Sequence, residues 1–133
     1  MMALHLPAVV TLLALLLFVY SFLAVGMARK KYGVAAPATT GAVEFEVVYR
    51  VQMNTLEQLV LFLPALWLFS EYVSPLWAGL LGLVWLVGRV LYSVSYIKDP
   101  KSRGPGFMIS FIASMVLILG AAVGVVMRIM AGL

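Results

Sequence analysis

A run of polar side chains interrupts an otherwise apolar stretch, RVQMNTLEQLVLFLP, between residues 50 and 64. Arg50, Asn54 and Glu57 follow the i, i+4, i+7 spacing that places side chains on one face of a helix. A guanidinium group, an amide and a carboxylate together offer donors and acceptors to a small ligand. This face is suited to binding a small, anionic and polar molecule beside lipid.

A second polar face follows further along the chain, where Arg89, Tyr92 and Tyr96 share one side of a helix. A tight turn near residue 73 makes the two helices antiparallel, so residues whose numbers sum to about 146 lie at similar depth. The depth rule pairs Glu57 with Arg89, Asn54 with Tyr92, and Arg50 with Tyr96. The two polar faces therefore match along their length, and they end near the basic loop residues Arg29, Lys30, Lys101 and Arg103.

Each of these residues also has a structural explanation. An unpaired charge at the centre of a membrane helix costs at least ~2.5–3.5 kcal/mol, so Glu57 and Arg89 are expected to face protein or water, where they could form a structural ion pair. Tyrosines are common at membrane interfaces, and Arg50 could extend its side chain to the interface. The matched stripe favours a ligand site over these separate explanations.

The composition sets the class of protein. Of the 133 residues, 65% are hydrophobic and only 11% are charged, which is too apolar for a soluble domain of this length. The chain has no cysteine and a single histidine, His5, so we expect no disulfide, no cysteine nucleophile and no metal site. The net charge of +4 arises largely from two short loops, which indicates membrane orientation rather than a nucleic-acid partner. The sequence predicts an integral membrane protein.

Four apolar runs, at about 4–28, 45–70, 76–97 and 107–130, each reach the ~20 residues that a helix needs to cross a bilayer. They are continuous rather than alternating, which favours helices over strands. We therefore expect an all-α, four-helix membrane bundle forming a single domain over residues 1–133. Basic residues mark loops one and three as cytoplasmic and both termini as lumenal or periplasmic. Whether the membrane is bacterial or that of the endoplasmic reticulum stays open.

Three segments resemble one known family over nearly the whole chain: ARKKYGVAAP, EFEVVYRVQMNTLEQLVLFLP and GRVLYSVSYIKDPKSRGPG. The most specific block is the pattern E-x-x-x-Y-R-x-Q-x-N-x-x-E, which is approximate at its first position. Its residues here are Glu46, Tyr49, Arg50, Gln52, Asn54 and Glu57. This pattern resembles that of the membrane-associated proteins in eicosanoid and glutathione metabolism, the MAPEG family.

The resemblance implies a homotrimer of four-helix protomers that binds glutathione between protomers, near the cytoplasmic face. It implies that Arg103 lies beside the glutathione sulfur. The hydroxyl of Tyr92 or of Tyr96 could then donate a hydrogen bond to the sulfur or orient the tripeptide, and Arg103 and Tyr92 are the candidate catalytic residues. The glutathione-binding residues that it implies are Arg29, Lys30, Arg50, Gln52, Asn54, Glu57, Gln58, Tyr92 and Tyr96. Two positions depart from leukotriene C4 synthase, because Gln58 replaces a tyrosine and Lys30 replaces an arginine. These departures favour a general glutathione transferase.

The function expected from the resemblance is transfer of glutathione, activated as a thiolate, to lipophilic electrophiles that arrive from the bilayer. Reduction of lipid hydroperoxides is a plausible second activity, and the electrophile itself stays open. The alternative is a non-enzymatic lipid-binding scaffold resembling the 5-lipoxygenase-activating protein, which would bind lipid without forming thiolate. A small multidrug exporter is disfavoured because the first span carries no acidic residue. A purely structural membrane protein is the remaining alternative.

Overall fold

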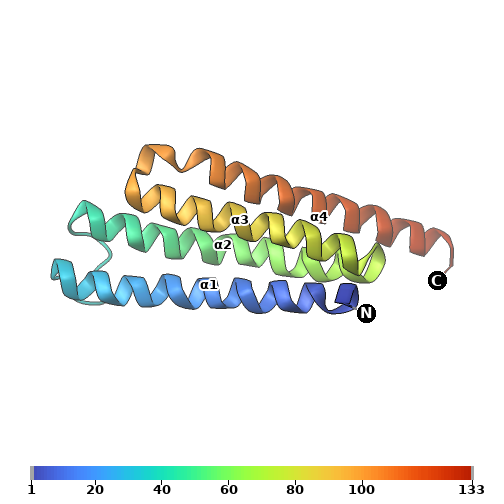
Figure 1. The fold of residues 1–133 in the computed structure, drawn as a ribbon, viewed down its shortest axis with the longest axis horizontal. Helices are drawn as coiled ribbons and strands as arrows, with labels where there is room; N and C mark the ends of the chain where they lie inside the picture. Colours follow the sequence, from blue (N-terminus) through green and yellow to red (C-terminus); the bar gives the residue numbers. More distant parts are fainter. Residues whose placement is uncertain (1, 133) are drawn as a thin grey trace.

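Four long helices lie side by side in the computed structural model, which describes residues 2–132 (Figure 1). They are α1 (Met2–Tyr32), α2 (Val43–Tyr72), α3 (Pro75–Lys98) and α4 (Gly104–Met130), and a short 3-10 helix, η1 (Pro100–Ser102), precedes α4. Each long helix contains one of the four apolar runs, so the predicted all-α fold with four spans is confirmed. The predicted domain begins at residue 1 and ends at residue 133, and these two residues lie outside the described part.

The turn between α2 and α3 is short because Ser74 and Pro75 start α3 two residues after α2 ends. The side-chain oxygen of Ser74 accepts a hydrogen bond from the backbone N–H of Trp77, at 3.3 Å. Pro75 then occupies the first helical position, where its missing N–H costs nothing and its fixed φ suits a helix. This cap makes α2 and α3 antiparallel neighbours, as the depth rule requires.

The turn between α3 and α4 is fixed by a serine. The hydroxyl of Ser102 donates to the backbone oxygens of Asp99, at 2.8 Å, and Ser95, at 3.1 Å. The Asp99 carboxylate in turn accepts from the backbone N–H of Lys101, at 3.1 Å. These bonds hold η1 against the end of α3, and thereby set where Arg103 leaves the turn.

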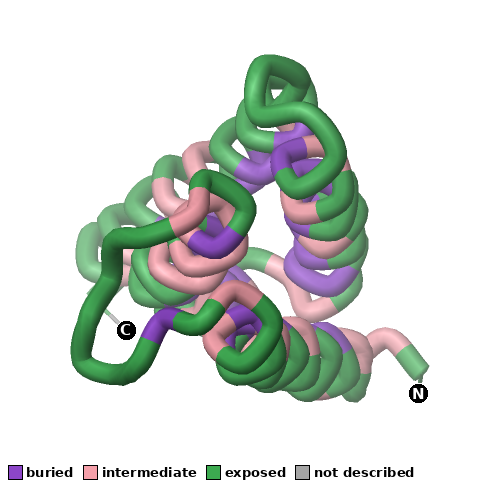
Figure 2. The backbone as a smooth tube through the Cα atoms, turned by 90° about the vertical axis from the view of Figure 1, so that its left-hand side faces the viewer, coloured by how far each residue is buried: buried purple, intermediate pink, exposed green. Residues whose placement is uncertain are grey.

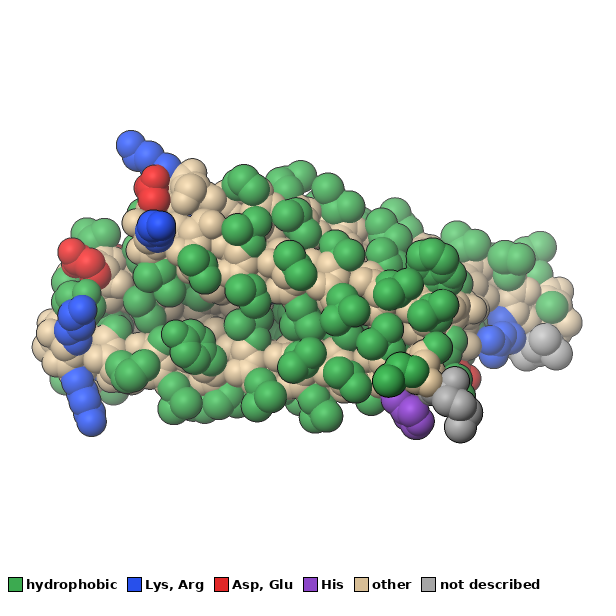
Figure 3. Space-filling view, viewed as in Figure 1, with side chains coloured by type: hydrophobic (Ala, Val, Ile, Leu, Met, Phe, Trp, Pro, Cys, Tyr) green, Lys and Arg blue, Asp and Glu red, His purple; other side chains and the backbone are tan. Residues whose placement is uncertain are grey.

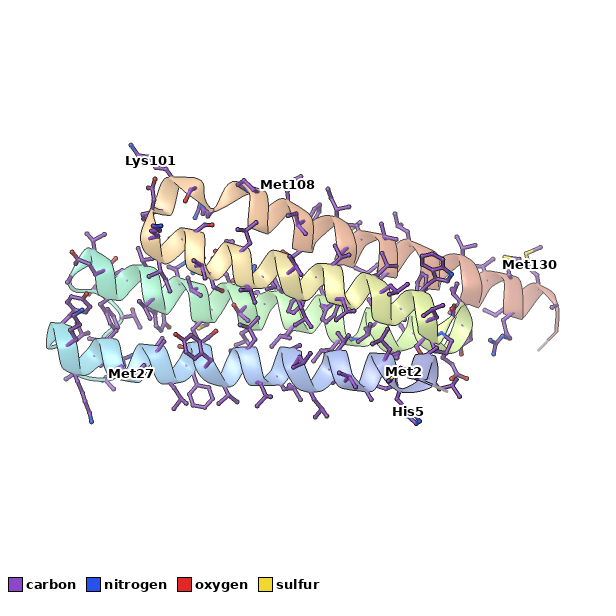
Figure 4. All side chains as sticks on the ribbon, viewed as in Figure 1. Met2, His5, Met27, Lys101, Met108 and Met130 are labelled. Atoms are coloured by element: carbon purple, nitrogen blue, oxygen red, sulfur yellow. The ribbon has the colours of Figure 1, made fainter. Side chains whose placement is uncertain are left out.

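The two ends of the bundle differ in charge. The α1–α2 loop and the α3–α4 turn lie at one end, whereas both termini and the α2–α3 turn lie at the other (Figure 1). Lys101 and His5 extend from these opposite ends (Figure 4). Figure 3 shows most of the visible Lys, Arg, Asp and Glu side chains at the loop end, with an apolar surface between the ends. We refer to the end with the α1–α2 loop and η1 as the loop end.

Buried residues line the facing sides of the helices, and exposed residues cover their outer sides (Figure 2). In the core, the rings of Phe62 and Trp85 stack at 4.0 Å with an angle of 4°, and both are fully buried. Large apolar side chains such as Leu16, Val87 and Ile112 face outward from the middle of the bundle and are at least half exposed. An apolar exterior over four helices long enough to cross a bilayer is typical of an integral, multi-pass membrane protein.

Candidate functional site

A pocket of about 390 Å³ opens between α2, α3 and the start of α4. The pocket lies at the loop end, because Arg103 and Gly104 line it. Arg103 is the last residue of the turn before α4, and Gly104 is the first residue of α4. The pocket brings together seven of the residues singled out in the sequence: Arg50, Asn54, Glu57, Gln58, Arg89, Tyr92 and Arg103. Three helices thus contribute polar side chains to one cavity in a bundle that is otherwise apolar.

The pocket is cationic. Arg89 also lines it, so three guanidinium groups, those of Arg50, Arg89 and Arg103, stand against the single carboxylate of Glu57. Arg50, Glu57 and Arg103 are exposed, whereas Arg89 is fully buried. The cavity therefore has a charged mouth that faces solvent and a buried cation further inside, which suits a ligand with more than one anionic group.

A chain of hydrogen bonds connects α2 to α3 across the pocket. Nη2 of Arg50 donates to the side-chain oxygen of Asn54, at 3.0 Å. The amide nitrogen of Asn54 in turn donates to the hydroxyl oxygen of Tyr92. The predicted matching of Asn54 with Tyr92 in depth is therefore confirmed, whereas Arg50 turns along its own helix to Asn54 instead of crossing to Tyr96.

Tyr96 positions Arg103 from behind the pocket. Nη1 of Arg103 donates to the Tyr96 hydroxyl at 3.3 Å, and the guanidinium carbon lies 5.2 Å from the centroid of the ring. Tyr96 is 8% exposed and packs edge-on against Tyr92, with centroids 5.5 Å apart. It is not among the residues that line the cavity. Its contact is with Arg103, an exposed side chain that would otherwise sample many rotamers.

The expected ion pair between Glu57 and Arg89 is absent from the described structure, and this corrects the sequence-based interpretation. Nη2 of Arg89 donates instead to the hydroxyl of Thr55, at 2.9 Å, and its guanidinium carbon lies 4.1 Å from the centroid of the Tyr92 ring. Nε and Nη1 of Arg89 have no hydrogen-bond partner. The reason is helical geometry, because Thr55 lies on the buried face of α2 whereas Glu57, two residues later, is exposed.

Two glycines allow α3 and α4 to approach closely at the site. A Cβ atom added to Gly106 would collide with the backbone of Tyr92 and would lie 2.9 Å from the carbonyl oxygen of Gly88. One added to Gly88 would lie 2.7 Å from the backbone nitrogen of Ser110. Small residues permit such backbone contact between membrane helices. The contact fixes the height of Tyr92 relative to the start of α4.

Three further residues expected from the resemblance lie outside this pocket: Arg29, Lys30 and Gln52. Nη1 of Arg29 donates to the backbone oxygens of Ala38, at 2.7 Å, and Val34, at 3.4 Å. The same guanidinium lies 5.2 Å from the ring centroid of Phe45. Arg29 is thus held at the α1–α2 loop, whereas the pocket is built by α2, α3 and α4. Within the described chain, Arg29 does not reach the pocket.

Sequence reasoning missed Thr55, Gly104 and Phe107. Phe107 and Gly104 line the pocket, and Thr55 holds the buried guanidinium of Arg89. The sequence signal for Thr55 was its position on the same helix, one residue after Asn54. Phe107 carried no signal, because one more aromatic residue at the start of an apolar span is unremarkable in sequence.

The fold and the pocket define an integral membrane protein with a polar, cationic cavity at one end of its helical bundle. The chain belongs to the MAPEG family, whose sequence profile matches residues 6–123. Three relatives illustrate the similarity. An uncharacterised protein from Synechocystis is 48% identical over 123 residues, which cover 92% of this chain and 90% of the relative.

Two relatives with named activities also match. Human microsomal glutathione S-transferase 2 is 43% identical over 103 residues, which cover 77% of this chain and 70% of the relative. Bovine leukotriene C4 synthase is 39% identical over 117 residues, which cover 88% of this chain and 78% of the relative. The family similarity covers all the helices that build the pocket.

Proposed function

We propose that this protein is a membrane-bound glutathione transferase that activates glutathione as a thiolate and adds it to lipophilic electrophiles. The observation that carries the proposal is the gathering of Arg50, Asn54, Glu57, Tyr92 and Arg103 around one cavity. The names of the human and bovine relatives, a glutathione transferase and a leukotriene synthase, support the same chemistry. No metal is part of the proposal.

The charges of the pocket match those of glutathione, which carries two carboxylates, one ammonium group and a thiol. Arg50 offers a guanidinium group to a carboxylate, and the free acceptors of Glu57 suit the ammonium group. Asn54 is oriented by its bonds to Arg50 and Tyr92. Its remaining hydrogen-bonding capacity is available to a peptide group of the ligand.

Arg103 is proposed to hold the sulfur as a thiolate. A thiol with a pKa of about 8.5 is only a few per cent ionised at neutral pH, and an adjacent cation favours the charged form. Arginine stays protonated and so does not take up the proton that the thiol releases. Tyr92 assists, because its oxygen accepts from Asn54 and its own O–H is left to donate to the sulfur.

The electrophile is proposed to enter sideways from the bilayer, past the apolar side chain of Phe107 in the pocket wall. Lipophilic compounds are concentrated there by partition, so the reaction requires no deep aqueous channel. The protein contributes ionisation and juxtaposition rather than a covalent intermediate. Reduction of lipid hydroperoxides by the same thiolate, with a second glutathione completing the disulfide, is proposed as a side activity.

Homotrimer formation is proposed to complete the site. Arg29, Lys30 and Gln52 do not reach the pocket of their own chain, and a neighbouring protomer is the source that would bring them to it. We also propose that the loop end faces the cytoplasm. Six of the nine basic residues lie there, namely Arg29, Lys30, Lys31, Lys98, Lys101 and Arg103, and the positive-inside rule orients that end inward.

A mixed assembly tests the shared site. Arg29→Met and Arg103→Met are each expected to be inactive alone. Co-assembled, the two variants are expected to regain part of the wild-type activity. In such an assembly, the Arg103→Met chain supplies an intact Arg29 and the Arg29→Met chain supplies an intact Arg103, so one interface carries both arginines. The measurement is conjugation of glutathione by the co-purified mixture, and activity no higher than that of the separate variants would contradict sharing between protomers.

The thiolate itself tests the proposed function. Adding glutathione to the purified protein at neutral pH is expected to produce the ultraviolet difference absorbance of a thiolate. S-methyl glutathione, which has no ionisable thiol, is expected to bind without this signal. Binding of lipid with no thiolate signal from glutathione would instead support the lipid-binding scaffold.

A further inference from the structure

Arg89 is a buried cation that the fold leaves largely unpartnered. Its side chain is fully buried, and Nε and Nη1 have no hydrogen-bond partner. Only Nη2 is bonded, to the hydroxyl of Thr55. Ionisable residues within membrane spans are rare and costly, and they usually mark a site where a ligand or an ion is handled. Arg89 belongs to the lining of the same cavity as the proposed glutathione site.

The packing around Arg89 does not require a charge. Its guanidinium group rests on the ring of Tyr92, with 4.1 Å between the guanidinium carbon and the centroid. Methionine is shorter, but it would fill the space of the aliphatic stem without burying a charge. Gln58, in the same pocket, also has a buried side-chain oxygen without a partner. Free polar atoms on two helices at one cavity indicate that their partner is a ligand.

Arg89 and Arg103 stand at the two ends of a pair of aromatic rings. Arg103 contacts the ring of Tyr96, Arg89 contacts the ring of Tyr92, and the two centroids are 5.5 Å apart. Arg89 precedes Tyr96 by seven residues, so it lies roughly 10 Å further along α3 from the loop end. Both guanidinium groups belong to the lining of the cavity, so a small conjugated molecule bound there meets Arg103 toward the loop end and Arg89 deeper in the bundle.

We propose that Arg89 binds the carbonyl oxygen of α,β-unsaturated aldehydes and ketones and stabilises the negative charge that develops there when the thiolate adds. The proposal rests on the glutathione activity proposed above, and it assigns both an electrophile class and a catalytic residue to the deep end of the pocket. Donors that are fixed before reaction, in a site with little water, are most effective where charge develops in the transition state.

The step balances without a further reagent. The thiolate sulfur forms a bond to the β-carbon, and the electron pair of the carbon–carbon double bond moves so that the carbonyl oxygen becomes an enolate oxygen. Arg89 holds this oxygen through its free N–H groups. The α-carbon then takes a proton from water, which replaces the one released when glutathione ionised, and the thioether with its carbonyl group leaves.

The proposal separates two kinds of electrophile. In conjugate addition the new negative charge appears on the carbonyl oxygen, which is proposed to bind Arg89. In displacement of iodide from an iodoalkane, the negative charge appears on the departing iodide. Both reactions need the same thiolate at Arg103. A defect confined to conjugate addition therefore identifies the role of Arg89 at the oxygen, and it cannot arise from poor glutathione activation.

The experiment compares 2-nonenal with an iodoalkane of the same chain length as substrates of the trimer-competent, purified full chain. In Arg89→Met, kcat/KM for 2-nonenal is expected to fall by about a hundredfold or more. The loss of rate with the iodoalkane is expected to be much smaller, and the thiolate absorbance is expected to persist. Arg89→Lys, which keeps the charge, is expected to retain part of the 2-nonenal activity.

Arg128→Met is the matched control. Arg128 also rests on a tyrosine ring, 4.7 Å from the centroid of Tyr72, and also donates through Nη2, to the backbone oxygen of Glu71 at 3.1 Å. It lies at the end of the bundle away from the pocket. Its replacement is expected to leave both reactions unchanged.

Each other outcome overturns the inference. Equal losses with both substrates, or no loss with either, would show that Arg89 does not act at the carbonyl oxygen. Loss of the thiolate signal in Arg89→Met would show that Arg89 acts on glutathione instead. Identical activities of the Lys and Met variants would exclude a role for the positive charge of Arg89. Absence of thiolate in the wild type is a different result, since it would reject the proposed function itself.

Discussion

Arg103→Met is expected to abolish thiolate formation while glutathione still binds. Arg103 is the pocket cation at the turn before α4, and it is held by the Tyr96 hydroxyl at 3.3 Å. An opposite charge within contact distance shifts a pKa by about 1–3 units, so its removal returns the thiol to the few per cent ionisation of free glutathione. The difference absorbance of thiolate at neutral pH measures this loss, and calorimetry measures the binding that remains.

Lys101→Met is the control for this substitution. Lys101 lies in the same turn and carries the same charge, but it extends outward from the end of the bundle (Figure 4). Its loss is expected to leave the thiolate signal intact. An undiminished signal in Arg103→Met would assign ionisation to another cation of the pocket, with Arg50 the next to test.

Gly106→Ala is expected to weaken the bundle at the site. The added methyl group collides with the backbone of Tyr92 and approaches the Gly88 oxygen to 2.9 Å, and backbone atoms cannot move aside as a flexible side chain can. Overpacking of this kind typically costs about 1–3 kcal/mol. The midpoint of thermal unfolding in detergent is expected to fall by about 4 °C or more. Tyr92 and the start of α4 separate, so thiolate formation is expected to fall as well.

Gly26→Ala is the matched control, because the added methyl group meets no other atom there. Gly26 lies inside α1, and no atom lies within 4 Å of a Cβ built on it. Alanine favours helices over glycine, so this variant is expected to be at least as stable as the wild type. Equal midpoints for the two variants would show that the α3–α4 contact at Gly106 is not tight in the folded protein.

Much of the pocket could be predicted from the sequence because its geometry is local. Helical periodicity alone puts Arg50, Asn54 and Glu57 on one side of α2, and the tight turn at Ser74 sets the depth of Tyr92 opposite Asn54. A serine cap followed by proline is readable in any sequence. The start of α4, and with it the place of Arg103, follows in the same way from the Pro and Gly residues of the third loop.

The partner of Arg89 could not be predicted. Equal depth made Glu57 the natural choice, but depth does not define the angle around the helix, and that angle brings Thr55 rather than Glu57 to the guanidinium. The close approach at Gly106 was equally hidden, because a glycine after Pro105 reads first as a turn residue. The place of Arg29, held at the α1–α2 loop and outside the pocket, was hidden as well, because helical periodicity does not place a loop side chain.

The position of Phe107 has a consequence for kinetics. The side chain of Phe107 lines the pocket and is 40% exposed. Under the proposed function, a lipophilic electrophile would reach the cavity past this side chain by lateral diffusion within the membrane. The concentration that governs saturation is then a mole fraction in the lipid phase, set by the partition coefficient and by the amount of lipid. At a fixed total amount of electrophile, added lipid or detergent dilutes it in two dimensions and raises the apparent KM. For glutathione, the proposed co-substrate, which stays in water, the apparent KM is expected not to change.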